Sequence, residues 1–359
     1  MMESQSRIPN PTERSADDSE RTRRRLPAEW EPHAATWVSW PHRPELWPGH
    51  FPQARAAWAA CVAALSRHET VRVLIPDARM ETEVRAVLQN TARGAARPDR
   101  VELHVIATDD IWIRDYGPLW FQSDGPADSV LQFGFNAWGE KFTPYHNDHA
   151  AGASMAAITA SRLFECAEVV EGGGIEWDGR GLFLSVADCV LLPSRRHGLD
   201  RPGFEALLRT RAGLRRMIWL ERGLPDDDTD GHIDLMARFV APGIVLAART
   251  KDDGHPAHAV LEANYAELRR KATAGEIELH ALPHPAPVYH EGRLLSRSYA
   301  NFYIANDCVL LPVYADRADE RARAVLEEFF PDREIIPVNC NELVLEGGAL
   351  HCMTMQQPL

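Results

Sequence analysis

Short apolar runs alternate with stretches of helical periodicity over most of this chain. Residues 51–66 place alanines and larger apolar side chains three and four positions apart, which predicts a helix. Residues 71–76 predict a short buried strand that a proline ends, 82–90 a second helix, and 101–106 another strand. This succession of strand, helix and strand is typical of the α/β class.

The alternation continues to the C-terminus, and two short sequences, called echoes below, each occur twice within it. Strands are predicted over 182–185, 189–193, 244–248, 277–282, 308–312 and 334–338, and helices over 204–210, 258–270 and 319–330. Asp-Cys-Val-Leu-Leu-Pro occurs at 188–193 and again at 307–312, and Glu-Gly-Gly at 171–173 and 346–348. The echoes are unevenly spaced, but they suggest repeated supersecondary units around a centre. No low-complexity linker interrupts residues 26–359, so we predict one domain there.

Composition agrees with an ordinary globular protein. Of the 359 residues, 45% are hydrophobic and 25% are charged. No apolar run approaches the length of about 18 residues that a membrane span needs. The formal net charge of −13 disfavours nucleic acid as a partner and mildly favours a cationic ligand. The six cysteines form no C-x-x-C pair, which favours reduced thiols and a cytoplasmic protein.

Residues 1–25 are polar and rich in arginine, serine and acidic residues. They lack the apolar segment of a secretory signal, so we predict a disordered N-terminal leader. Four arginines between residues 21 and 25 could bind anions, although a solvated tail is the simpler interpretation.

Polar clusters interrupt the apolar pattern and are candidates for chemistry. The first, DDIWIRDYGP at 109–118, follows a predicted strand, where ligand-binding loops lie in α/β folds. If that strand persists, alternation places Asp115 on the same side as Ile111 and Ile113. A buried carboxylate needs a cationic partner, which is either the neighbouring Arg114 or a substrate cation.

The second cluster, EGGGIE at 171–176, combines three glycines with two glutamates. Glycines allow close approach of the backbone to a ligand. The lysine and the spacing of a phosphate-binding loop are absent, so nucleotide binding is not expected. A tight turn with an exposed Glu171 is the simpler alternative to a binding role.

The third cluster, DDDTDGHID at 226–234, begins like a calcium-binding loop. Its twelfth position is Ala237 instead of a bidentate glutamate, which excludes that loop. In a strand, His232 and Asp234 would share one face, and a histidine beside a carboxylate can act as general acid and base. The alternative is a surface acidic loop with an incidental histidine. No short pair of ligands supports a zinc site.

Cys352, seven residues from the C-terminus, is the last candidate. Alone, it is most simply a free thiol in a terminal strand. Together with His232, Asp115 and Asp234, it suits attack on a planar cationic carbon. Paired carboxylates bind a guanidinium through charge-assisted hydrogen bonds, and the bound cation favours the thiolate. The histidine protonates the leaving amine and then activates water.

A series of motifs in fixed order connects the chain to a known family. The motifs are LPAEW at 26–30, WIRDYGP at 112–118, FNAWG at 135–139, EGG at 171–173, TDGHID at 229–234, SYANFY at 298–303 and LHCMT at 350–354. Through them, residues 26–358 closely resemble the agmatine deiminase and bacterial peptidylarginine deiminase family of guanidine-modifying enzymes. Tyr116, Glu346 and Ala349 depart from residues common in agmatine deiminases and leave the expected catalytic set intact.

The resemblance implies a fold and a set of roles. The fold is a five-bladed α/β propeller of ββαβ-type units around a pseudo-fivefold axis, with the site at the axis. Cys352 corresponds to the nucleophile, His232 to the general acid/base, and Asp115 and Asp234 to the carboxylates that bind the guanidinium. The expected substrate-binding residues are Trp112, which would wall the pocket, and Glu171. Neither a metal nor another cofactor is expected.

The reaction implied is hydrolysis of agmatine to N-carbamoylputrescine and ammonia through a covalent Cys352–amidino intermediate. Such a hydrolase of linear amidine C–N bonds serves polyamine metabolism and putrescine biosynthesis. The alternatives are deimination of arginine or peptidyl-arginine, transfer of the amidino group to an amine, and polyamine binding without catalysis. Neither nucleic acid nor a membrane is an expected partner, and members of the family are often homodimers.

Overall fold

Five sheets make up most of the fold, and four of them share one connectivity. The computed structural model describes residues 25–91, 96–122 and 129–359, so the predicted leader lies, apart from Arg25, outside the described residues. In four sheets an antiparallel pair of strands is followed by a helix and by a third strand parallel to the second. These sheets contain β4 (Leu119–Phe121), β5 (Ser129–Gly134) and β6 (Arg162–Val169); β7 (Ile175–Trp177), β8 (Leu182–Val186) and β9 (Arg216–Leu220); β10 (Ala237–Ala241), β11 (Ile244–Arg249) and β12 (Glu278–Pro283); and β15 (Tyr303–Ile304), β16 (Cys308–Val313) and β17 (Glu334–Asn339).

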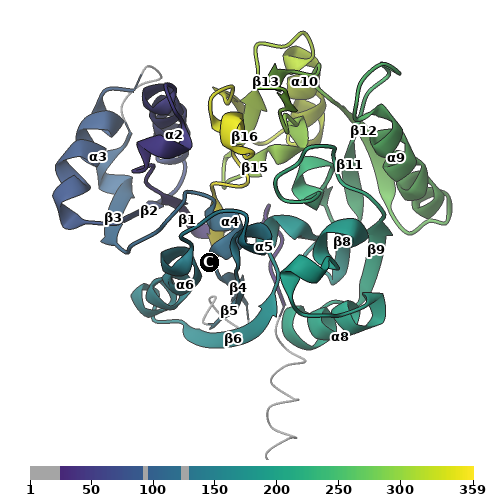
Figure 1. Ribbon diagram of the computed structural model, residues 1–359, viewed down its shortest axis with the longest axis horizontal. Coiled ribbons are helices and arrows are strands. Elements are labelled where there is room, and N and C mark those ends of the chain that lie inside the picture. Colours follow the sequence, from purple (N-terminus) through teal and green to yellow (C-terminus); the bar gives the residue numbers. More distant parts are fainter. Residues whose placement is uncertain (1–24, 92–95, 123–128) are drawn as a thin grey trace, which may run out of the picture.

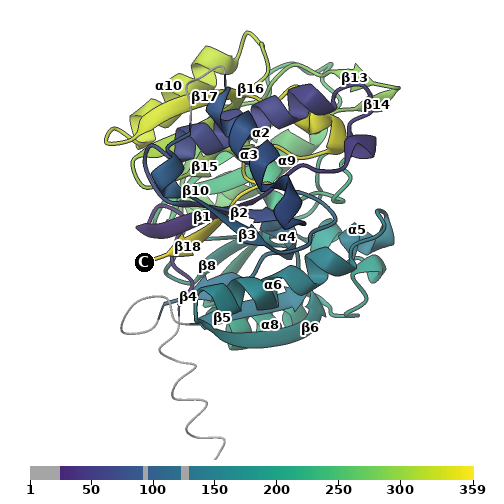
Figure 2. The same ribbon diagram turned by 90° about the vertical axis from the view of Figure 1, so that its left-hand side faces the viewer.

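The fifth sheet joins the two ends of the described chain. Its strands are β18 (Met355–Pro358), β1 (His33–Ser39), β2 (Val71–Ile75) and β3 (Val101–Val105), in that order. The C-terminal strand supplies the antiparallel partner of β1, with Trp37 opposite Met355 and His33 opposite Pro358. Figure 2 shows β18 beside β1, with the C-terminus at its end. The last residues are therefore part of a sheet. The turn that precedes β18 and contains Cys352 is thus held between η8 (Leu343–Glu346) and this strand.

Helices lie on the outer side of the sheets. Figure 1 shows the sheets around the middle of the molecule, with α3, α6, α8, α9 and α10 toward the periphery. The α-helices are α2 (Phe51–Leu65), α3 (Glu81–Gln89), α4 (Ile113–Tyr116), α5 (Ala137–Glu140), α6 (His146–Ile158), α7 (Ala187–Val190), α8 (Arg201–Ala212), α9 (His258–Thr273) and α10 (Asp319–Phe329). Short 3-10 helices are η1 (Pro44–Leu46), η2 (Ala78–Met80), η3 (Pro98–Arg100), η4 (Gly172–Gly174), η5 (Pro193–Arg195), η6 (Ile233–Leu235), η7 (Tyr299–Asn301) and η8 (Leu343–Glu346), and a small hairpin is formed by β13 (Tyr289–His290) and β14 (Arg293–Leu294).

Most elements predicted from apolar periodicity are found within a few residues of their expected ends, but the strand predicted over 189–193 is wrong. That segment forms α7 and η5, whereas the same hexapeptide at 307–312 forms most of β16. The second copy lies between β15 and β17 in its sheet. In the first unit, β8 already occupies that central place between β7 and β9. An apolar hexapeptide is compatible with either state, and the available sheet partners decide.

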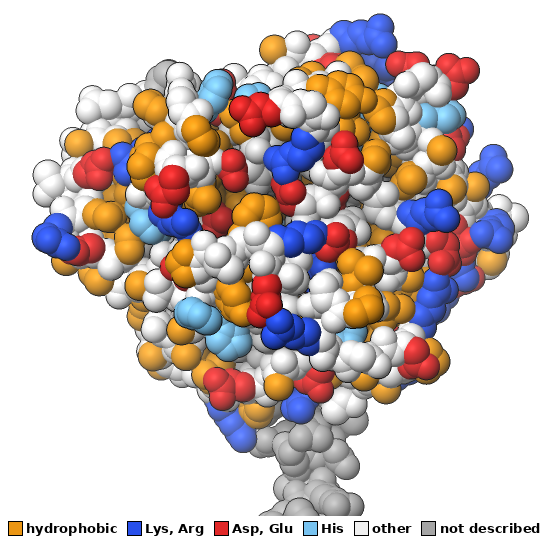
Figure 3. All heavy atoms as spheres, in the orientation of Figure 1, with side chains coloured by type: hydrophobic (Ala, Val, Ile, Leu, Met, Phe, Trp, Pro, Cys, Tyr) orange, Lys and Arg blue, Asp and Glu red, His pale blue; other side chains and the backbone are white. Residues whose placement is uncertain are grey.

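The surface has mixed charge. Figure 3 shows acidic and basic side chains interspersed over one face, with hydrophobic side chains between them. Among the described residues, no helix combines the length and the apolar character needed to cross a bilayer.

Candidate active site

The structure brings the predicted nucleophile, histidine and two aspartates together at one cavity. They come from α4, from η6 with the residue before it, and from the turn between η8 and β18. Trp112, the predicted wall, also contributes to the lining. The lining residues are Asp110, Trp112, Asp115, Trp138, Phe142, Asp228, Thr229, His232, Asp234, Leu235, Glu346, Gly347, Gly348 and Cys352.

The segment around Asp115 is helical, so the strand alternation expected for residues 111–115 is wrong. Residues 113–116 form the single turn α4, and all four side chains are buried. The Arg114 side chain points away from Asp115, since its Nη1 donates to Gln356 Oε1 (2.8 Å) and its Nη2 to Glu29 Oε2 (3.3 Å). Its backbone N–H donates to the Cys352 carbonyl (3.0 Å). The neighbouring arginine therefore anchors the C-terminal turn and does not pair with Asp115.

Asp115 is a buried carboxyl group held by neutral donors. Its Oδ1 accepts from the Gly173 N–H (2.8 Å) and its Oδ2 from Trp138 Nε1 (3.0 Å). Burial raises the pKa of Asp115 to about 6, and the nearby charges of Asp234 and Glu171 add to the effect of burial. A cation that enters the cavity would stabilise the ionised form of this carboxyl group.

His232 and Asp234 reach the cavity from a conformation that was not expected. His232 precedes η6 and Asp234 lies within it, so the two do not share a strand face as expected; the strand β10 begins only at Ala237. His232 Nδ1 lies 3.6 Å from Asp115 Oδ1, and its Nε2 lies 3.8 Å from Glu171 Oε2. Burial lowers the pKa of His232, but Asp115, Glu171 and Asp234 outweigh burial and raise it to about 9. At neutral pH the imidazole therefore carries a proton that it can donate.

Glu171 lies behind His232 and not among the residues that line the cavity. It is fully buried, which contradicts the exposed turn considered for it. Arg195 Nε donates to Glu171 Oε1 (2.9 Å). Glu171, Cys189 and His232 place possible metal ligand atoms within 4.8 Å of one another, but the guanidinium of Arg195 already balances the Glu171 carboxylate there. This position suits support of His232 better than direct contact with a substrate.

Cys352 is buried and closely surrounded by polar groups. Asn301 Nδ2 donates to its Sγ (3.1 Å), and its Sγ lies 3.6 Å from Asp234 Oδ2. Burial raises the pKa of the Cys352 thiol well above its usual range, and the Asp234 and Asp115 carboxylates raise it further. Burial and these carboxylates therefore favour the thiol form of Cys352, and a cation bound in the cavity would favour the thiolate form.

Two glycines allow the close packing of this site. A Cβ on Gly173 would lie 2.6 Å from His232 Nδ1 and 2.8 Å from Asp115 Oδ1. A Cβ on Gly348 would overlap the six-membered ring of Trp112. The Glu-Gly-Gly echo thus has a physical basis, because each copy lets backbone pass against a side chain of the cavity.

Asp110 and Glu346 line the cavity and are only partly buried, unlike the buried Asp115, Asp234 and Cys352, so we assign them to its mouth. Burial raises the pKa of Asp110 to about 7, and burial together with the Asp110 charge raises that of Glu346 to about 7. Asp228 is instead neutralised by Arg293, whose Nη1 lies 2.6 Å from Asp228 Oδ1 and whose Nη2 donates to the Leu345 carbonyl (2.9 Å). Asp110 and Glu346 are thus available for a second positive charge, while Arg293 is already paired with Asp228.

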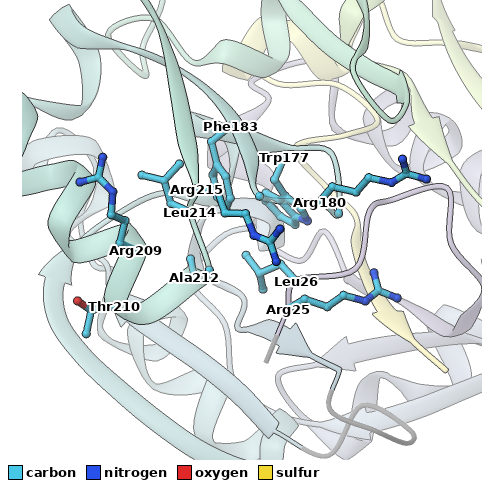
Figure 4. A pocket seen from close by; sticks show the side chains of 13 residues that line it. Arg25, Leu26, Trp177, Arg180, Phe183, Arg209, Thr210, Ala212, Leu214 and Arg215 are labelled. Carbon is cyan, nitrogen blue, oxygen red and sulfur yellow. The ribbon is translucent and has the colours of Figure 1, made fainter. Parts of the chain in front are cut away.

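A larger cavity of about 690 Å³ lies elsewhere, between the N-terminal part of the described chain, the β7–β8 turn and the end of α8. Figure 4 shows Arg25, Arg180, Arg209 and Arg215 around its apolar floor of Leu26, Trp177 and Phe183. Its cationic rim repels a guanidinium, and none of the described residues that line it is a cysteine or a histidine. The chemistry therefore belongs to the smaller, acidic cavity.

Several polar residues of the site were missed from the sequence. They are Asn301, which contacts Cys352; His351, which bonds to Asp234; and Glu29, which bonds to His351. Asn301 and Glu29 lie inside motifs that carry the resemblance, and His351 precedes Cys352, so position in a motif was the available signal.

Comparisons with known proteins agree with this geometry. The sequence profile of the Porphyromonas-type peptidyl-arginine deiminases matches residues 25–358. The agmatine deiminase of Pseudomonas aeruginosa (strain LESB58) is 33% identical over 359 aligned positions, covering 93% of this chain and 95% of that protein. Among solved structures, agmatine deiminase of Enterococcus faecalis superposes with a TM-score of 0.86 at 27% identity, covering 94% of this chain and 97% of that one. A cysteine-to-serine variant of the C. jejuni agmatine deiminase with substrate bound gives 0.83 at 28%, covering 93% and 96%.

Proposed function

The chain belongs to the Porphyromonas-type peptidyl-arginine deiminase family, and on that basis we propose that it hydrolyses agmatine to N-carbamoylputrescine and ammonia. The observation that carries the choice of substrate is the distribution of charge along the cavity. Asp115 and Asp234 lie beside the Cys352 thiol at the inner end, and Asp110 and Glu346 lie at the mouth. Agmatine carries a guanidinium at one end and an ammonium at the other, so each end meets carboxylates.

An arginine substrate would place a carboxylate where the mouth is acidic. Arg293, whose charge acts on Glu346, is already paired with Asp228. Like charges at the mouth therefore disfavour arginine and a C-terminal arginyl peptide relative to agmatine.

The reaction begins with binding. Asp115 and Asp234 take the guanidinium through charge-assisted hydrogen bonds, and Trp112 packs against its flat face or the alkyl chain. The bound positive charge lowers the pKa of the Cys352 thiol, which loses its proton to water and becomes a thiolate. The sulfur then forms a bond to the central carbon of the guanidinium, which becomes tetrahedral.

Two proton transfers by His232 complete the cycle. The imidazolium donates its proton to a terminal amino nitrogen of the tetrahedral adduct, the C–N bond breaks, and ammonia leaves, so that an S-amidino intermediate remains on Cys352. The neutral His232 then accepts a proton from water as the water oxygen bonds to the same carbon. Cleavage of the C–S bond releases N-carbamoylputrescine and returns the sulfur for the next turnover. Glu171 and Arg195 support His232 from behind.

The experiment is ammonia release by the purified full chain from agmatine, arginine and an arginyl peptide. Turnover should be strongest with agmatine and absent in Cys352→Ser, which should still bind agmatine. Ammonia from another guanidine but none from agmatine would refute the substrate assignment. Wild-type turnover by Cys352→Ser would remove the sulfur from the mechanism.

We further propose that the five sheets are blades of one five-bladed propeller domain over residues 26–359. The support for this arrangement is the connectivity shared by four of the sheets, the antiparallel-then-parallel order β18-β1-β2 of the fifth, and the disposition of all five around the middle of the molecule (Figure 1). The family resemblance leads us to expect a homodimer. The cysteine pattern leads us to expect a cytoplasmic protein. Sedimentation of the purified chain tests the dimer.

A further inference from the structure

His351, the residue before the predicted nucleophile, sits between two carboxylates. It is buried, and its Nδ1 lies 2.7 Å from Asp234 Oδ2 while its Nε2 lies 2.8 Å from Glu29 Oε2. Ionised carboxylate oxygens only accept hydrogen bonds, so both ring nitrogens must donate. A neutral imidazole would turn a lone pair toward one of the carboxylates. The geometry therefore directs one ring N–H of His351 to each carboxylate.

Glu29 is fixed on its other side. Its Oε1 accepts from Arg238 Nη2 (2.9 Å) and from the Ile304 N–H (2.8 Å). Burial alone would raise the pKa of Glu29, but Arg238, His351 and Arg114 hold it well below its usual range. Glu29 therefore stays ionised and gives His351 a rigid, charged support.

Asp234 uses its two oxygens differently. Its Oδ2 faces His351, Asn301 (3.2 Å) and the Cys352 sulfur, whereas its Oδ1 is buried without a hydrogen-bond partner among the described residues. Burial would raise the pKa of Asp234, but the hydrogen bond and charge of His351 bring it below its usual range. An unpartnered buried carboxylate oxygen at a cavity wall is an acceptor that awaits a donor.

We propose that His351 is a positioning residue, which holds Asp234 charged and turned so that its free oxygen receives the substrate guanidinium. This inference rests on the proposed function. The charged or titratable groups that face Asp234 are His351 and Cys352 from the C-terminal turn, Asp115 from α4, Asp227 and His232 from the loop before η6, and Arg238 from β10. His351 is the one whose nitrogen bonds directly to Asp234.

His351→Gln tests the proposal, because glutamine fills much of the same space and donates a hydrogen bond but carries no charge. Asp234 should then take up a proton more readily. In wild type the acid limb of the kcat/KM profile for agmatine follows Asp115, whose pKa is about 6. Without the His351 charge, burial should raise the pKa of Asp234 past that of Asp115, so the limb should move up by about one pH unit or more. At pH 7, KM should rise about tenfold or more while kcat changes much less. A role confined to stability would lower Tm and leave both the limb and KM in place.

His33→Gln is the matched control. His33 is also buried between a carboxylate and a second acceptor, with Nδ1 3.3 Å from Glu69 Oε1 and Nε2 2.8 Å from the Glu29 carbonyl, but it does not line the cavity. His33→Gln should lower Tm without moving the acid limb. An acid limb that stays in place in His351→Gln, as in His33→Gln, would overturn the proposal.

A binding measurement separates this inference from the proposed function. Calorimetric titration of guanidinium chloride into Cys352→Ser, with and without His351→Gln, needs no turnover and no particular substrate. As the pH is lowered, the affinity for guanidinium should begin to fall at a higher pH in the variant that also carries His351→Gln. If wild-type protein releases no ammonia from agmatine, the proposed function fails and this titration still decides the role of His351. Identical pH dependence in both variants, or no binding of guanidinium by either, would refute it.

Discussion

Gly173→Ala places one methyl group among three groups of the proposed catalytic set. The new Cβ would lie 2.6 Å from His232 Nδ1, 2.8 Å from Asp115 Oδ1 and 3.1 Å from Asp234 Oδ2. Ordinary non-bonded contacts lie near 3.5 Å, so the histidine and the aspartate must together retreat by about 0.5–1 Å. The φ angle of Gly173 is not in the left-handed region, so alanine meets no backbone penalty and the methyl group acts alone.

Gly173→Ala should lower the activity of the protein more than it disturbs its fold. A displacement of about 1 Å in a catalytic constellation lowers rates about a hundredfold, which corresponds to about 2.7 kcal/mol in the activation free energy. The Gly173 N–H that donates to Asp115 would move as well. We therefore expect kcat/KM for agmatine to fall about a hundredfold, measured as ammonia release, in a protein whose circular dichroism is unchanged.

Gly174→Ala is the matched control. Its Cβ would meet Val190 Cγ1 at 3.2 Å and the His232 ring only at 3.7 and 3.8 Å, so a small movement of the valine makes room. Activity should stay within about threefold of wild type, as for a tolerated small-to-large change. A Gly173→Ala protein that keeps full kcat/KM, or a Gly174→Ala protein that loses as much, would refute the assignment of Gly173 to the packing of the site.

Further predictions concern the mouth of the cavity, proton transfer and the C-terminal strand. Glu346→Gln should raise KM for agmatine about tenfold, since one charge-assisted hydrogen bond is lost, and should change turnover of methylguanidine little; equal effects on both would contradict an ammonium site at Glu346. In wild type, kcat/KM should be bell-shaped: it falls below about pH 6 as Asp115 takes up a proton, and above about pH 9 as His232 loses the proton that it donates. A profile that stays flat through both values would contradict these roles. Deleting residues 355–359 keeps Cys352 but removes β18, and should abolish turnover and lower Tm, whereas an active truncated protein would show that the C-terminal turn is ordered without its strand.

How well the sequence predicts a feature of this structure depends on how far apart along the chain the interacting residues lie. Elements such as α2 and β16 follow from local apolar periodicity, because burial of one face decides them. The segment 189–193 fails because its conformation depends on which strands are available in its sheet. His232 and Asp234 were placed together by an argument from a strand, but they reach the same cavity through a 3-10 turn.

The polar partners of the site are harder to predict. Glu29 and His351 are 322 positions apart and bond directly, and Asn301 reaches Cys352 across 51 positions. No local pattern encodes such pairs, since each residue alone is compatible with a surface loop. The family resemblance supplies the four central residues, but the charge balance around them becomes visible only when the elements are assembled.

The pairing of β18 with β1 also sets the order of events when the chain folds. Cys352 and the strand that holds it are synthesised after the intervening sheets, and their partner β1 is synthesised before them. Contacts between such distant segments form late, after the intervening units have provided a scaffold. The nucleophile is therefore secured only after β18 has been made and has paired with β1. Leu359, 58% exposed at the outer end of β18, is the position where an added sequence would disturb this closure least.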